Sequence, residues 1–393
     1  MNNIIDKLNR NPVLFSICVA TLFFGFYVAL LDPVLSKDSY TYSRWADTLL
    51  KHSFNYKEYF NEVNFYTPPF LYSGFVSVVA MTKKILGDNW QQGIVVINTI
   101  SYIAISGLIS QLLYRATNNG IAAIFSSVLF ILCIECFIWI RYILSDPTFL
   151  FLTVLSTFLL LLLTENKSSK KLWFVCILVM FFLAIYRPTA LPSIIVIVLS
   201  YLLFQLNIST QLLRSGLAKY SLFFFISIVL LSIFLMAYIM QDIRRWPLDF
   251  ASDYLNMISD SYQKGNIIDD RPETFVFPPD NFFDYIKIIF IRFYYFFVFS
   301  IDAYSFRHSL INYFVFIPSY LFGILGSYEL LSSKSSISEK TWKLGMISLL
   351  MICSTFVFVS FLLIDYDWRY RLVIMPSIFI LAGIGINRFK NYD

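Results

Sequence analysis

Long apolar runs recur along the whole chain and set the strongest limit on its fold. The first extends from Pro12 to Leu31, close to the ~20 residues that a helix needs to cross a bilayer. Of the 393 residues, 58% are hydrophobic and only 14% are charged, too few to cover a soluble protein of this length. We therefore expect an all-α polytopic membrane protein, with a single domain over residues 1–393.

The N-terminus predicts an uncleaved first helix. Lys7 and Arg10 precede the first apolar run, which is longer than the core of a signal peptide and lacks a small-residue cleavage site. The basic end of this helix is expected on the inner side.

Ten apolar stretches have the length of complete spans. Two more, 69–86 and 286–303, are rich in aromatic residues but interrupted by lysine or arginine. The predicted spans are 12–31, 93–113, 120–140, 147–164, 172–186, 189–206, 220–241, 308–330, 344–364 and 371–387.

The distribution of basic residues predicts the orientation, because cytoplasmic loops carry an excess of lysine and arginine. The basic segments all fall on one side only if 69–86 and 286–303 do not cross the bilayer. We expect these two stretches to lie at the outer interface as juxtamembrane or re-entrant helices, with both chain ends inside. Twelve full spans is the alternative. The expected inner segments are 115–119, 165–171, 207–219, 332–343 and 388–393; the main outer loops are 32–92 and 242–307.

Asp38 follows the first span and is the first candidate for chemistry. Ser36 is a plausible N-cap, which places Asp38 in the first turn of a short helix and Tyr42 on the same face. An ionised carboxylate at the edge of the bilayer can act as a general base. The simpler reading is a solvated helix-capping acid.

Three further charged residues stand at span ends. Arg141 closes one span, and Asp146 is well placed to cap the helix that Pro147 begins. Arg187 lies between two apolar helices, where it can either snorkel to the interface or bind a phosphate. Charges so near lipid are costly and usually have a use.

Arg369, Tyr370 and Arg371 precede the last span. Two arginines at positions i and i+2 cannot share a helix face, so we expect at least one to point into the protein. An aromatic interface belt is the alternative. Glu135 is the main charged exception within the spans and is expected to be a buried, hydrogen-bonded acid. The polar segment 242–285 is either a lid or a solvated loop.

The order of these motifs resembles the GT-C membrane glycosyltransferases, especially the family 39-like group of protein mannosyltransferases and aminoarabinose transferases. An outer-loop aspartate with a following tyrosine is succeeded by an aromatic-Pro-Pro segment, Tyr66 to Tyr72. Arg-Tyr-x-Leu-x-Asp, Tyr-Arg-Pro-Thr and Trp-Arg-Tyr-Arg then follow at later span ends. The resemblance covers nearly the whole chain.

The resemblance implies transfer of a sugar, with inversion, from a polyprenyl-phosphate donor to a glycan, glycolipid or protein acceptor. The reaction would take place at the outer face of a bacterial cytoplasmic membrane. Asp38 matches the acidic residue of the first loop and would be the catalytic general base or a group that positions a metal ion or the acceptor. Asp146 matches the second acidic position. A divalent metal ion held by Asp38 and Asp146 is left open. The expected substrate-binding residues are Tyr42, Arg141, Asp146, Arg187, Arg369, Tyr370 and Arg371.

The chain departs from the family at two positions of the first loop. Ser39 stands where many relatives have a second acid, and Thr67 where many have histidine. A polysaccharide polymerase that joins lipid-linked units and a non-catalytic lipid-linked sugar carrier are the other readings. Membrane lipids are expected partners, and nucleic acid is not.

Overall fold

The structure is a computed structural model that describes residues 11–63, 69–166, 169–205, 282–301, 304–332, 337–361 and 368–389. This part of the chain is helical and contains no β-strand. Six of its helical stretches are long and apolar enough to cross a membrane, or seven if one bent pair is a single span. An all-helical fold with several such stretches is thereby confirmed. The predicted span 220–241 and loop segment 242–281 lie outside the described residues.

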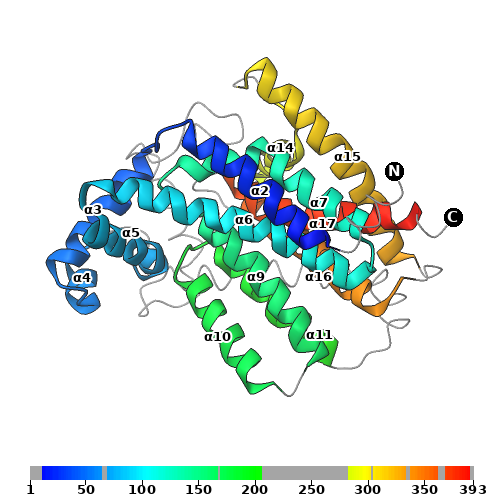
Figure 1. The fold of residues 1–393 in the computed structure, drawn as a ribbon, viewed down its shortest axis with the longest axis horizontal. Coiled ribbons are helices and arrows are strands. Elements are labelled where there is room, and N and C mark those ends of the chain that lie inside the picture. Colours follow the sequence, from blue (N-terminus) through cyan, green and yellow to red (C-terminus); the bar gives the residue numbers. More distant parts are fainter. Residues whose placement is uncertain are drawn as a thin grey trace.

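A bundle of long helices makes up most of the molecule (Figure 1). Within it, α10 and α11 are only 15 and 16 residues long, so the count of ten spans stays a prediction. The bundle helices are α2 (Pro12–Ala29), α6 (Trp90–Thr117), α7 (Gly120–Leu132), α9 (Asp146–Glu165), α10 (Lys170–Ala184), α11 (Ala190–Gln205), α15 (Phe306–Leu331), α16 (Glu339–Phe361) and α17 (Met375–Asn387).

The outer faces of the bundle are apolar, whereas many of its small polar side chains point inward. Leu22 and Phe26 of α2 are 75% and 68% exposed, while Ser106 and Ser126 are fully buried between helices. A soluble bundle would reverse this pattern, because water would disfavour so many exposed leucine and phenylalanine side chains. The arrangement suits helices whose outer solvent is lipid.

Two glycines let α15 and α17 approach closely. A Cβ atom on Gly326 would collide with the carbonyl oxygen of Leu381, and one on Gly385 with that of Phe322. Small residues at such crossings are typical of membrane helices, which associate mainly through close packing.

A separate lobe covers one end of the bundle (left in Figure 1). It consists of α3 (Lys37–Lys51), α4 (Tyr56–Glu62), η1 (Pro69–Tyr72), α5 (Ser73–Leu86) and η2 (Gly87–Asn89). Tyr59, Phe75 and Val79 of the lobe belong to an apolar cluster that continues into the bundle through Phe149 and Leu183.

The length of α6 explains how this lobe joins the bundle. Its 28 residues span about 42 Å, more than the ~30 Å of bilayer hydrocarbon, and Ile94 and Val95 near its start belong to the core of the lobe. The helix α5 packs against α3 and α6. The interfacial placement of 69–86 stays a prediction, because η1, α5, η2 and α6 together form one of the six apolar stretches.

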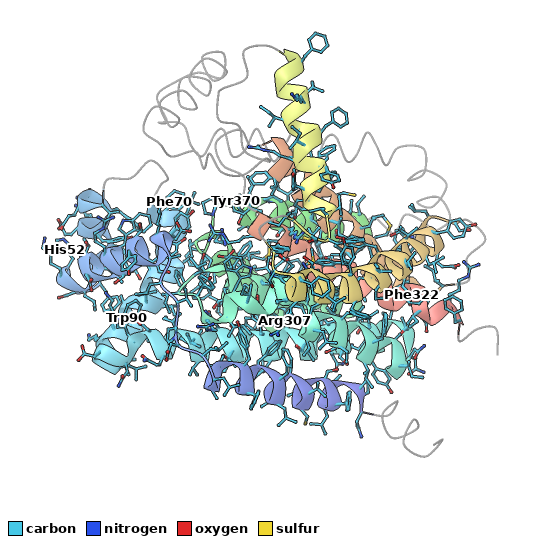
Figure 2. The ribbon with its side chains drawn as sticks, turned by 90° about the horizontal axis from the view of Figure 1, so that it is seen from above. His52, Phe70, Trp90, Arg307, Phe322 and Tyr370 are labelled. Atoms are coloured by element: carbon cyan, nitrogen blue, oxygen red, sulfur yellow. The ribbon has the colours of Figure 1, made fainter. Side chains whose placement is uncertain are left out.

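The span after α6 is broken. Between α7 and the short helices α8 (Ile134–Phe137) and η3 (Ile138–Arg141) the axis bends by 55°. Cys133 at the break has an extended backbone. Among the described helices, α14 (Phe282–Phe297) stands out from the bundle (Figure 2) and contacts α16 and the 3-10 helix η4 (Trp368–Ile374). It does not count among the six span-forming stretches.

The segment ends predicted to be cytoplasmic gather at the end opposite the lobe. Arg115 and Lys340 both contact Glu165, and the Asn119 side-chain amide donates to Asn387. Four segment ends far apart in sequence therefore share one end of the bundle. Lys334, which belongs to the same predicted inner segment 332–343 as Lys340, lies outside the described residues.

Candidate active site

Asp38 lies at the start of α3, as the sequence predicts. Ser36 caps this helix by accepting a hydrogen bond from the backbone N–H of Ser39, and the Ser39 hydroxyl accepts one from the backbone of Ser36. This reciprocal capping box fixes the first turn, where the helix dipole favours the charged form of Asp38.

Tyr42 follows one turn later and is buried against the rings of Tyr72 and Phe75. Burial, together with neighbouring Tyr72, raises the pKa of Tyr42 well above its usual value. Its hydroxyl therefore remains protonated and can donate a hydrogen bond to an anion.

Asp146 and Arg187 form a buried ion pair between the start of α9 and the corner that joins α10 to α11. Asp146 is 4% exposed and Arg187 is 8% exposed. The expected capping role is not seen, because Ser145 occupies the N-cap position and makes no side-chain capping bond. The Arg187 guanidinium lies 5.9 Å from the ring centres of both Phe149 and Tyr370, so it does not snorkel.

The 3-10 helix η4 sends three consecutive side chains in three directions, because this helix has three residues per turn. Both terminal nitrogens of Arg369 donate to Asp38 Oδ2 at 3.2 Å, and the Arg369 guanidinium also lies 5.6 Å from the Trp139 ring centre. Tyr370 faces Arg187. Arg371 points into the bundle and is 1% exposed, as expected for one of the two arginines.

The two ion pairs differ in exposure. The side chain of Asp38 is 49% exposed and that of Arg369 is 15% exposed, against 5% for Asp146 and 9% for Arg187. Asp38 is therefore the carboxylate that a dissolved or membrane-borne molecule can reach. Asp146 is buried and pairs with Arg187 inside the protein.

Arg141 lies close to this site, but its side chain is hydrogen-bonded to the protein backbone. Its Nε and Nη2 atoms donate to the carbonyl oxygen of Asp32 at 2.8 and 2.7 Å, and its own carbonyl accepts from Val34 N. These bonds fix the connection between the first span and α3. Among the predicted residues, the structure brings together Asp38, Tyr42, Asp146, Arg187, Arg369 and Tyr370.

Arg371 belongs to a second polar cluster, in the broken span. Its Nη2 atom lies 3.0 Å from Glu135 Oε2, and its Nη1 donates to the carbonyl of Val298. Oε1 of Glu135 is 3.0 Å from Nε2 of His308 and accepts from Asn312 at 2.8 Å. Glu135 is thus the buried, hydrogen-bonded acid that the sequence predicts, with both carboxylate oxygens in use.

Several members of these clusters escape sequence reasoning. Tyr72 packs on Tyr42 and feels the charges of Asp38, Asp146 and Arg187. Tyr72 is the last residue of the aromatic-Pro-Pro segment, so this motif could have pointed to it. Residues 64–68, which include the start of the motif, lie outside the described part. His308 and Asn312 carry no sequence signal beyond being polar residues in an apolar helix.

The described residues do not fit a divalent metal ion. No three histidine, cysteine, aspartate or glutamate side chains within that part of the chain stand close enough to hold one. Asp38 and Asp146 are each paired with an arginine, whose charge repels a cation. We therefore derive no step that uses a metal.

No family model, curated protein or solved structure matches this chain.

Proposed function

We propose that this chain is a membrane glycosyltransferase that uses a polyprenyl-phosphate-linked sugar as its donor. The acceptor is a glycan, glycolipid or protein at the outer face of a bacterial cytoplasmic membrane. One observation carries the proposal: Asp38, Asp146, Arg187 and Arg369, from four distant segments, meet beside the lobe at one end of the bundle.

In this reaction Asp38 acts as the general base. The acceptor hydroxyl gives its proton to the exposed carboxylate as its oxygen attacks the anomeric carbon of the sugar. The bond between that carbon and the phosphate oxygen breaks, and the electron pair leaves with the polyprenyl phosphate. Attack from the face opposite the leaving group inverts the anomeric centre.

Arginine suits the leaving group, because the negative charge on the phosphate grows as the bond breaks. Arg369 is the more exposed of the two site arginines and exchanges its contact with Asp38 for one with the phosphate. This exchange frees the base at the moment when the donor binds. Arg187, which pairs with Asp146, adds a second positive charge that is fixed in position. Tyr42 supplies a hydroxyl group that can donate a hydrogen bond.

A polysaccharide polymerase is a variant of the same chemistry in which the acceptor is itself a lipid-linked glycan. The exposed side of Asp38 would serve either acceptor. The two functions differ in their product, since a polymerase yields a ladder of repeat units and a single-sugar transferase yields one addition.

A lipid-linked sugar carrier is favoured by a different observation. Carriers commonly place charged residues beside broken membrane helices, and Glu135 with Arg371 lies at the 55° break after α7. However, both oxygens of Glu135 contact protein donors, so this carboxylate is already engaged and is not free to accept from a substrate.

The test is transfer from radiolabelled polyprenyl-phosphate sugars in membranes that contain the full chain. Asp38→Asn removes the base and is expected to lower turnover about 10² to 10⁴-fold. Arg369→Gln is expected to lower it by about 10² or more, because it removes a donor to the leaving phosphate.

Asp88→Asn is the matched control, since Asp88 is an exposed aspartate of η2 in the same lobe. Full transfer by both site variants would overturn the proposal. Movement of intact donor across vesicles without any glycosylated product would instead establish the carrier.

A further inference from the structure

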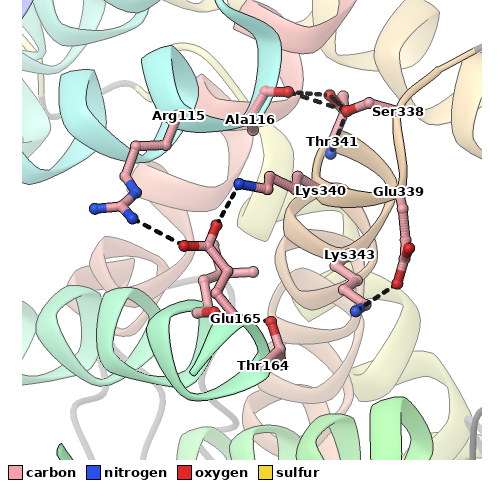
Figure 3. Close-up of polar contacts among 10 residues, drawn as sticks. Arg115, Ala116, Thr164, Glu165, Ser338, Glu339, Lys340, Thr341 and Lys343 are labelled. Atoms are coloured by element: carbon pink, nitrogen blue, oxygen red, sulfur yellow. Dashed lines mark hydrogen bonds and ion pairs between the residues drawn. The ribbon is translucent and has the colours of Figure 1, made fainter. Parts of the chain in front are cut away.

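A pocket opens at the end of the bundle opposite the candidate active site. It has a volume of about 200 Å³ and lies between the last turns of α6 and α9 and the first turn of α16. Its inner wall is apolar and includes Leu112, Phe158 and Leu161. Its rim carries three basic and two acidic side chains (Figure 3).

The rim has more positive charge than its acids neutralise. Glu165 contacts Arg115 at 2.8 Å and Lys340 at 2.9 Å, and Glu339 contacts Lys343 at 2.6 Å. Three cations against two carboxylates leave one positive charge over. A guanidinium has five N–H donors and an ammonium three, so Arg115 and Lys340 keep donors for another anion besides Glu165.

The apolar wall and the charged rim of the pocket together indicate which class of ligand it can bind. Pockets that enclose drug-sized soluble ligands measure roughly 300–1,000 Å³, so this one is too small to surround such a molecule. A lipid needs only part of itself enclosed, because the remainder stays in the bilayer. The pocket lies at the ends of three apolar helices, where lipid phosphates would meet a basic rim.

We propose that this pocket binds an anionic phospholipid of the leaflet at this end of the bundle. The phosphate contacts Arg115 and Lys340 at the rim, and one acyl chain lies against Leu112, Phe158 and Leu161. On the predicted topology this is the cytoplasmic leaflet, whose anionic lipids attract basic residues beside the membrane. The site is distinct from the proposed active site and does not depend on its function.

The experiment measures binding of spin-labelled phosphatidylglycerol and phosphatidylcholine to the full chain in nanodiscs. We expect the wild-type protein to retain phosphatidylglycerol about fivefold better, as one net favourable charge contact would give. Arg115→Gln with Lys340→Gln should abolish this preference. Equal retention of the two lipids by the wild type, or an undiminished preference in the double variant, would refute the proposal.

Glu165→Gln provides a sharper test because it predicts a gain. Without its charge, Arg115 and Lys340 lose their acidic competitor, so the preference for phosphatidylglycerol should rise several-fold. A purely structural clamp would give no rise, and that result would count against the site. Lys57→Gln, an exposed lysine of α4 in the lobe, is the control and should change nothing.

A last arm separates a lipid from a soluble phosphate. Glycerol 3-phosphate should displace the spin label far less well than short-chain phosphatidylglycerol, since it lacks the acyl chain that fills the apolar wall. Equal displacement by the two would show that the site takes a soluble phosphate ester and would overturn the lipid assignment.

Discussion

Glu135 and Arg371 form a deeply buried ion pair outside the candidate active site. Their side chains are 8% and 2% exposed, and each has a further hydrogen-bond partner: Asn312 donates to Glu135, and Arg371 donates to the carbonyl of Val298. Such a pair contributes little relative to well-packed apolar residues, yet the loss of one partner is costly because it leaves a lone charge in a low dielectric.

This asymmetry makes a prediction for thermal unfolding in detergent. Glu135→Gln and Arg371→Met should each cost about 3–5 kcal/mol, whereas the double variant with both changes should recover much of that loss. Lys51 and Glu62, an exposed pair, are the control, for which either single change should leave the melting temperature nearly unchanged. A double variant whose loss equals the sum of the two single losses would contradict the coupling.

Sequence reasoning placed Asp38 and Arg369 in one predicted site, but it did not predict that they form an ion pair. The spacing of Arg369 and Arg371 predicts that they diverge, yet it cannot say which one turns inward. That choice depends on η4 being a 3-10 helix and on Glu135, 236 positions earlier in the chain. The burial of two residues that are distant in sequence depends on the tertiary structure, so a local sequence motif cannot predict it.

At the scale of elements, the crossing of α15 and α17 depends on two glycines. Gly326→Ala and Gly385→Ala would each push a methyl group into the carbonyl of the opposite helix. Overpacking of this kind typically costs about 1–3 kcal/mol, so both variants should have a lower melting temperature in detergent.

Gly25→Ala is the matched control for this contact. A Cβ at Gly25 of α2 would meet nothing within 4 Å, and alanine favours helix more than glycine does. Its melting temperature should be unchanged or higher. Equal losses for all three variants would show that the α15 and α17 crossing is not the cause.

The helices themselves were largely predictable, because apolar runs of this length have few alternatives. The start of α3 was equally readable from Ser36 and Asp38. The break at Cys133 was not, since 120–140 reads as one continuous apolar stretch and neither glycine nor proline marks the bend.

At the scale of the whole molecule, the described helices separate two groups of charges to opposite ends. The lobe with Asp38 covers one end, and Arg115, Glu165 and Lys340 occupy the other. The sequence predicts which end faces the cytoplasm from its basic loops. In the fold, the described basic segment ends lie together at one end, as predicted. A labelling experiment can determine on which side of the membrane this end lies.

Cysteine labelling with an impermeant reagent supplies that measurement, in a background with the five native cysteines replaced by serine. Tyr40→Cys in α3 should react in intact cells, because Tyr40 is 63% exposed in the lobe. Lys171→Cys at the start of α10, also exposed, should react only after permeabilisation. The reverse pattern would invert the orientation and remove the outer-face site with it.

The 3-10 geometry of η4 limits which changes the chain can tolerate between its two arginines. One added or deleted residue between Arg369 and Arg371 would rotate the following side chains by about 120°. Arg371 would leave Glu135, or Arg369 would leave Asp38, and no side-chain adjustment could restore both. The length of this segment is therefore as constrained as its composition: conservative substitutions can survive there, but insertions and deletions cannot.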